Sequence, residues 1–81
     1  MATASANVKS PSKAQLERFV AIRNESGFSS NLQFSFDADE CGFKVEQLGT
    51  PVRAGSNYAW RIEGVGTLLE IDGRLSFDPL S

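Results

Sequence analysis

A short acidic run contains the first residues whose types and spacing could do chemistry. Asp37 and Asp39 stand at the first and third positions of a calcium-loop pattern, and Gly42 stands at the sixth. The pattern then fails, because Cys41 occupies the fifth position and Leu48 the twelfth, where a bidentate Glu belongs. We interpret the run as a solvated acidic turn between strands, in which the glycine supplies an unusual backbone angle.

The other reactive side chains do not form a catalytic set. The chain has one cysteine and no histidine, so a thiolate nucleophile would lack its usual base, and the count excludes a Cys/His zinc site. Four carboxylates remain, but no spacing ties two of them to one cleft: Glu63, Glu70, Asp72 and Asp78. We therefore expect no enzymatic activity, no cofactor and no metal.

Five aromatic residues could instead form a stacking platform for sugars or bases: Phe34, Phe36, Phe43, Tyr58 and Trp60. A platform displays its rings on a solvated sheet face, and that use would leave few large residues for a core. We therefore assign the rings to the core. A small-ligand or carbohydrate-binding domain that uses Tyr58 and Trp60 is the alternative.

Composition and charge narrow the class of partner. The 81 residues have a net charge of −2 and no dense basic patch, so we do not expect nucleic acid as a ligand. No apolar run approaches the ~20 residues that span a bilayer, and residues 1–7 lack a signal-peptide pattern, so we expect no membrane contact. A single cysteine favours a reducing compartment, either the cytoplasm or a particle assembled inside the cell.

Two stretches, residues 31–38 and 56–63, alternate apolar and polar side chains. A period of two is typical of a strand with one buried face. We expect a core built from these stretches and from the C-terminal hairpin: Leu32, Phe34, Phe36, Tyr58, Trp60, Ile62, Leu69, Leu75 and Phe77.

Weaker signals predict the other elements. Short strands are expected at residues 18–24 and 43–48, and an irregular crossing or sheet edge at 52–55. The first of these strands is ambiguous, because Ser12 and Gln15 fit a helix-capping box and a short helical turn could precede it.

The last hairpin has two possible registers. A two-residue loop at residues 72–73 would pair Glu70 with Leu75, whereas a three-residue loop at 71–73 would pair Glu70 with Arg74. We choose the three-residue loop, because it separates polar from apolar faces and a slip by one residue would destroy that pattern.

Five to six short strands joined by short turns predict an all-β fold, either a small antiparallel β-sandwich or a partly open barrel. Residues 13–81 form its single domain. Residues 1–12 are mostly small and polar, so we expect a flexible N-terminal arm.

Apolar residues that break the alternation are the remaining candidates for function. They form either a partner surface beside open sheet edges or a second layer of the core, and the sequence does not separate these interpretations. With two residues of the arm included, the candidate partner-binding residues are Val8, Lys9, Phe28, Leu48, Val65, Leu68 and Leu80.

Small size, the lack of a complete site and an arm beside open sheet edges favour a non-enzymatic protein-binding module. Such a module would be a structural or accessory subunit of a larger assembly, or an inhibitor of a partner protein. Its partner would be another protein or a second copy of the chain, because an arm that orders on binding can cover a large surface.

Overall fold

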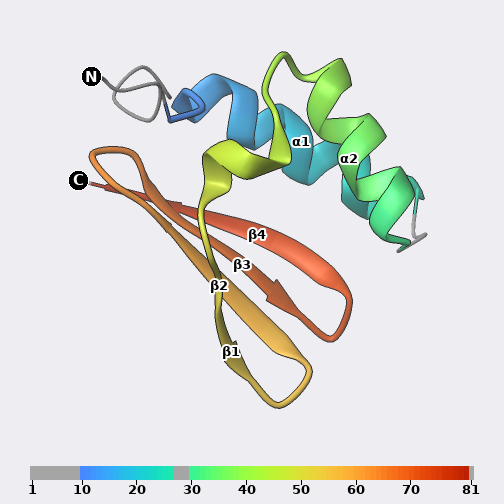
Figure 1. The fold of residues 1–81 in the computed structure, drawn as a ribbon, viewed down its shortest axis with the longest axis vertical. Helices are drawn as coiled ribbons and strands as arrows, with labels where there is room; N and C mark the ends of the chain where they lie inside the picture. Colours follow the sequence, from blue (N-terminus) through green and yellow to red (C-terminus); the bar gives the residue numbers. More distant parts are fainter. Residues whose placement is uncertain (1–9, 27–29, 81) are drawn as a thin grey trace, which may run out of the picture.

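Two helices cover one face of a four-strand antiparallel sheet (Figure 1). The computed structural model describes residues 10–26 and 30–80. The elements in chain order are α1 (Lys13–Ser26), α2 (Asn31–Glu40), the 3-10 helix η2 (Val45–Leu48), β1 (Val52–Ala54), β2 (Asn57–Ile62), β3 (Gly66–Ile71) and β4 (Arg74–Pro79). The strands lie in the order β1-β2-β3-β4, so the sheet is a meander of consecutive hairpins.

The all-β prediction is wrong, because the fold mixes helices with a sheet of only four described strands and is neither a sandwich nor a barrel. Residues 18–24 and 31–38 are helical, and most of 43–48 is a 3-10 helix. The alternation at 31–38 misled the prediction because Leu32 and Phe36 are four residues apart. On a helix they share the outer face, where they are 66% and 55% exposed.

Both α-helices begin directly after a serine that caps them. Ser12 Oγ accepts a hydrogen bond from Gln15 N–H at 3.1 Å, and Gln15 Oε1 accepts one from Ser12 N–H at 2.8 Å, so the capping box is confirmed. Ser30 Oγ likewise accepts from Gln33 N–H at 3.1 Å at the start of α2. The same Ser-x-x-Gln spacing thus precedes both helices, and the second copy was a usable helix signal.

The core lies between the helices and the covered face of the sheet. Phe19 of α1 is fully buried and makes edge contacts with Phe34 and Phe43, at ring-centroid distances of 5.1 and 5.2 Å. The other buried apolar side chains come from every layer: Leu16, Ala38, Cys41, Leu48, Trp60, Ile62, Leu68 and Leu75. The prediction that residues 56–63 form a strand with Trp60 and Ile62 inward is confirmed.

The register of the last hairpin differs from the one we chose. Glu70 pairs with Leu75, and Ile71 pairs with Arg74, so the loop has two residues, Asp72 and Gly73. Both loop residues have positive φ, 54° and 80°, as a type I′ turn requires. The shift by one residue places Leu68 and Glu70 on the covered face, and it moves Leu69 out of the predicted core.

Gly66 sets the approach of β3 to β4. A Cβ at this position would lie 2.4 Å from the Asp78 carbonyl oxygen and 2.8 Å from Pro79 Cα. No side chain fits between the two strands at this point, and the backbone φ of +152° also disfavours one.

Asn24 joins α1 to the outer edge of the sheet. Its side-chain amide donates to the Leu75 carbonyl at 2.7 Å and accepts from Leu75 N–H at 2.8 Å. The amide therefore pairs with β4 as a neighbouring strand would, and it closes part of that edge. β1, at the opposite edge, has only three residues with an arginine at its centre, features that discourage further strand pairing.

A buried ion pair joins α1 to α2. Arg23 Nη1 lies 3.1 Å from Asp37 Oδ2, and the two side chains are 7% and 4% exposed. Gln33 Nε2 donates to the other carboxylate oxygen at 2.9 Å, and the guanidinium lies 5.2 Å from the centroid of the Phe34 ring. Arg23 Nε is buried without a hydrogen-bond partner in the described part of the chain, so the pair is incompletely satisfied.

We expect Asp37→Ala to lower the free energy of unfolding by about 3–5 kcal/mol, because it leaves the Arg23 guanidinium buried without its carboxylate. Replacing both partners, Arg23→Met with Asp37→Leu, should cost much less than the two single changes together. Urea unfolding followed by Trp60 fluorescence measures all three variants. Additive losses in the double variant would show that the two side chains are not coupled.

We expect Asn24→Ala to destabilise the domain by about 1–3 kcal/mol, since the Leu75 amide and carbonyl groups lose their partners. Glu25→Ala, at the exposed neighbouring position, is the control and should stay within about 0.5 kcal/mol of the parent. Thermal and urea denaturation provide the comparison, and equal effects of the two changes would rule out Asn24 as the link between α1 and β4.

Candidate functional site

The helices leave one face of the sheet uncovered, and we call it the open face. Its side chains alternate with those of the core along every strand: Val52, Ala54, Asn57, Ala59, Arg61, Thr67, Leu69, Ile71, Arg74, Ser76 and Asp78. No helix of the described chain packs on this side (Figure 1).

Apolar side chains gather on the half of the open face nearest β1. Cross-strand pairing aligns Val52, Ala59 and Leu69 in one row across three strands. Val52 is 64% exposed and Ile71, in the next row, is 48% exposed. These residues line a shallow, mostly apolar depression of about 200 Å³.

Charged side chains lie beside this apolar area. Arg74 and Asp78 lie on β4, two residues before and two residues after Ser76, and Arg61 lies on β2 beside Thr67. None of the three forms an ion pair with another residue in the described segments. The open face therefore combines an apolar area beside β1 with exposed charges of both signs on β2 and β4, and protein interfaces likewise combine apolar and polar surface.

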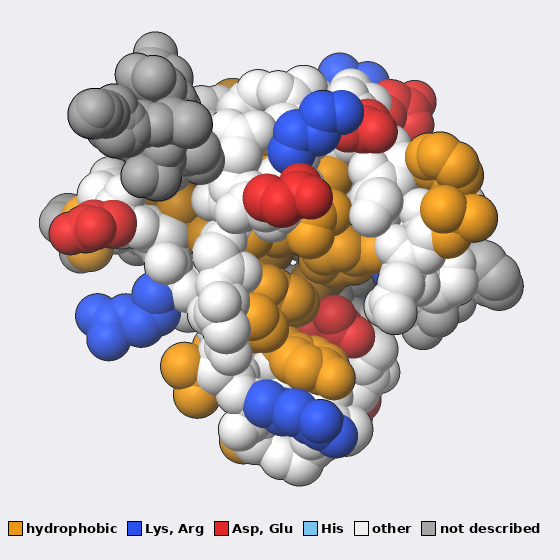
Figure 2. Space-filling model, in the orientation of Figure 1, with side chains coloured by type: hydrophobic (Ala, Val, Ile, Leu, Met, Phe, Trp, Pro, Cys, Tyr) orange, Lys and Arg blue, Asp and Glu red, His pale blue; other side chains and the backbone are white. Residues whose placement is uncertain are grey.

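A second candidate binding site is a groove between the helical layer and the sheet. We call this groove the aromatic groove. It holds about 380 Å³ and is lined by Asn31, Phe34, Ser35, Val45, Gly49, Pro51, Tyr58, Trp60 and Glu70. Figure 2 shows hydrophobic side chains gathered around a hollow at the middle of this side of the molecule.

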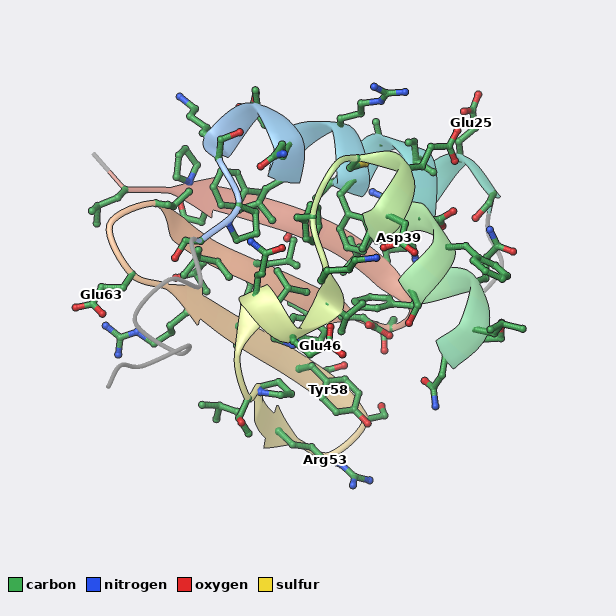
Figure 3. All side chains as sticks on the ribbon, turned by 45° about the horizontal axis from the view of Figure 1, so that its top comes forward. Glu25, Asp39, Glu46, Arg53, Tyr58 and Glu63 are labelled. Atoms are coloured by element: carbon green, nitrogen blue, oxygen red, sulfur yellow. The ribbon has the colours of Figure 1, made fainter. Side chains whose placement is uncertain are left out.

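The rings of the aromatic groove are already engaged with one another. Trp60 stacks against Phe34 and Tyr58, at centroid distances of 5.7 and 5.9 Å. The Arg53 guanidinium lies 5.9 Å from the Tyr58 centroid, at the β1 end of the sheet (Figure 3). A sugar needs a free ring face, so this stacking disfavours Trp60 as a platform. The half-buried Glu70 carboxylate is the charged group of the groove.

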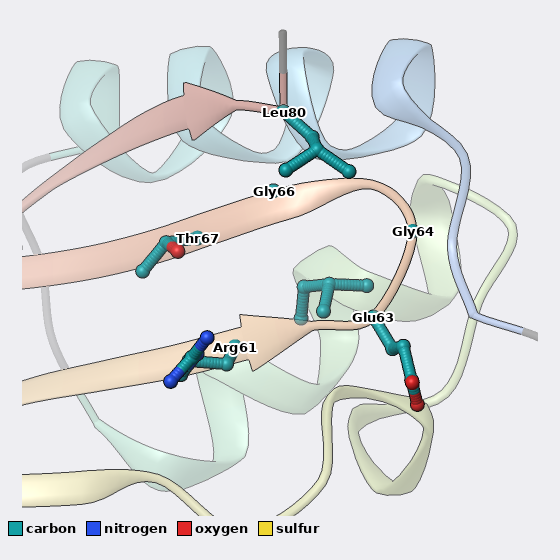
Figure 4. A pocket seen from close by; sticks show the side chains of 7 residues that line it. Arg61, Glu63, Gly64, Gly66, Thr67 and Leu80 are labelled. Atoms are coloured by element: carbon teal, nitrogen blue, oxygen red, sulfur yellow. The ribbon is translucent and has the colours of Figure 1, made fainter.

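A third hollow, of about 380 Å³, lies at the turn between β2 and β3 (Figure 4). Arg61, Glu63 and Leu80 contribute side chains to its rim. Leu80 N–H donates to the Val65 carbonyl at 2.9 Å, so two sequence-predicted partner residues do lie side by side here. Leu80 is 68% exposed, whereas Val65 packs partly against the core.

Two of the other predicted partner residues lie inside the described structure. Leu48 and Leu68 are 3% and 0% exposed. Of the two interpretations, partner surface or second core layer, the core interpretation therefore holds for these two residues. The 3-10 helix turns Leu48 inward, and the two-residue hairpin loop does the same for Leu68. Val8, Lys9 and Phe28 lie outside the described residues.

The acidic run is not a solvated turn between strands, because Asp37 is buried in α2 by its pair with Arg23. Gly42 does supply a positive φ of 92° after the helix. Lys44 Nζ lies 2.9 Å from Asp39 Oδ1, and this hydrogen bond raises the pKa of the exposed lysine. No group of three potential metal ligands lies together among residues 10–26 and 30–80.

Cys41 is a free, buried thiol at the end of α2. Burial raises the pKa of this thiol above its ordinary value. Because the protonated form is a poor nucleophile, the residue acts as a small apolar member of the core.

Sequence reasoning missed two pairs of exposed apolar residues. Leu32 and Phe36 project from α2, and Val52 and Ile71 belong to the open face. The spacing of four residues was a signal for the first pair. Ile71 could not be found without the hairpin register, which decides the face on which each β3 side chain lies, and Val52 depends on the pairing of β1 with β2.

Fold and surfaces together define a small two-layer domain of helices on a sheet, with one sheet face uncovered. No protein-family model, curated protein or solved structure matches the chain at a significant level. In the described part of the chain, neither helix has the length and apolar character needed to cross a membrane.

We expect Trp60 to emit at shorter wavelength in the native protein than in concentrated urea, because its side chain is 7% exposed. Acrylamide should quench this emission several-fold less in the native protein than in the unfolded chain, which is the control. Titration with simple sugars should leave the spectrum unchanged. A saturable sugar-dependent shift would contradict our interpretation that the stacked rings are unavailable.

Proposed function

We propose that this chain is a non-enzymatic protein-binding domain whose contact surface is the open face. The observation that carries the proposal is the row formed by Val52, Ala59 and Leu69, with Ile71 beside it, on a sheet face that the helices leave uncovered. Burial of this surface by a partner would be favourable at roughly 25 cal/mol per Å² of apolar area.

The other surfaces support binding less well. Leu32 and Phe36 on α2 are only two side chains, and scattered exposed apolar residues are normal. The aromatic groove would serve the alternative function, binding of a carbohydrate or another small ligand. Its Trp60 ring is already stacked between neighbours in sequence and space, which weighs against that use.

We also propose that the protein is located in a reducing compartment, either the cytoplasm or a particle assembled inside the cell. Its support is the single free Cys41 thiol, which is buried and unpaired with any other cysteine. A structural or accessory role in a larger assembly fits a small domain with one surface to cover.

Affinity capture from the native lysate should recover a partner with the parent chain and lose it with Ile71→Asp, because the charge cannot be buried against an apolar surface. Phe36→Asp is the matched control, since it places the same charge at an exposed aromatic residue on α2. Bound proteins are quantified by mass spectrometry.

The capture of the same partner by parent and Ile71→Asp chains would overturn the assignment of the open face. Loss with Phe36→Asp alone would place the contact on α2 instead. Circular dichroism and urea unfolding of each variant must match the parent, because both positions are exposed and neither change should disturb the core.

A further inference from the structure

We propose that the open face pairs with the open face of a second copy of this chain in a two-fold symmetric dimer. This inference rests on the proposed function and names its partner. A two-fold interface requires a surface that is complementary to itself. If one residue of the first copy contacts a second residue of the other copy, the reverse contact is also made. The charges and the strand register of the open face meet this requirement.

The symmetry axis runs across the strands, along the row Val52, Ala59, Leu69 and Ser76. Rotation about this axis stacks the two sheets and brings each residue of the row opposite its own copy. The row contains only apolar or small side chains, so no charge is buried at the centre. Stacked sheets lie about 10 Å apart, which leaves room for Leu69 to meet Leu69 of the second copy.

The same rotation places opposite charges together at the rim. Arg74 and Asp78 stand two residues on either side of Ser76 on β4, so the axis exchanges their positions. Arg74 of each copy then faces Asp78 of the other, giving two symmetry-related pairs. Both side chains are exposed in the single chain and form no ion pair within its described residues.

The remaining positions agree with this axis. Thr67 would face Ile71, and Arg61 would face Asn57, so no two like charges meet. An axis parallel to the strands fails this test, because it would carry the charges of β4 over the β1 side of the sheet. There Arg74 would meet Ala54 and gain no acidic partner. Charge complementarity therefore selects the axis across the strands.

The size of the surface predicts a weak dimer. Three strands of six residues and one of three residues cover a footprint of at most roughly 20 by 20 Å on each copy. That area lies at or below the low end of stable interfaces, where association is transient. We expect a dissociation constant on the order of 0.1 mM, so dimer and monomer coexist at ordinary laboratory concentrations.

Sedimentation equilibrium from about 10 μM to 1 mM tests the inference. Arg74→Asp alone and Asp78→Arg alone should each weaken the dimer at least about tenfold, because like charges then face each other. The double variant that carries both changes should recover the parent affinity to within about threefold, since the swapped charges are again complementary. Arg18→Asp, an equal charge change on the exposed side of α1, is the control and should leave the affinity unchanged.

A chain that stays monomeric to 1 mM would overturn the inference. So would a dimer that the single charge reversals do not weaken, or one that the double variant does not restore. These results remain distinct from failure of the proposed function. A monomer whose captured partner is still lost with Ile71→Asp uses the open face for a different protein.

Discussion

The register of the β3–β4 hairpin is the constraint on which the rest of the structure depends. A two-residue turn at Asp72 and Gly73 places Leu68 under the helices and Leu69 on the opposite side. A three-residue turn would exchange those faces along the whole strand. The core, the carboxylate of the aromatic groove and the apolar row of the open face all follow from this single choice.

The helical layer uses polar contacts to fix its position over the sheet. Arg23 and Asp37 join the two helices inside the core, and Asn24 pairs with the backbone of β4. Buried ion pairs add little net stability, but they fix geometry because either partner alone is costly. These contacts hold the helices on one face of the sheet and leave the open face uncovered.

Much of the candidate site could not be predicted from residue patterns. Leu32 and Phe36 alternate as strand residues do, yet a spacing of four fits a helix equally well, and the Ser30 cap decides between them. Leu68 and Leu69 are adjacent and equally apolar, so no local pattern tells which one is buried. By contrast, β2 was predictable, since Trp60 and Ile62 are buried and Arg61 between them is exposed.

The sequence by itself determined the β2 strand, the position of the last hairpin, the Ser12 cap and the positive φ of Gly42, because each depends on neighbouring residues. Tertiary structure decided the helical state of residues 31–38, the hairpin register and the uncovered face. These depend on which apolar surfaces meet across the chain. Local patterns record only how often side chains alternate, whereas burial depends on partners far away in sequence.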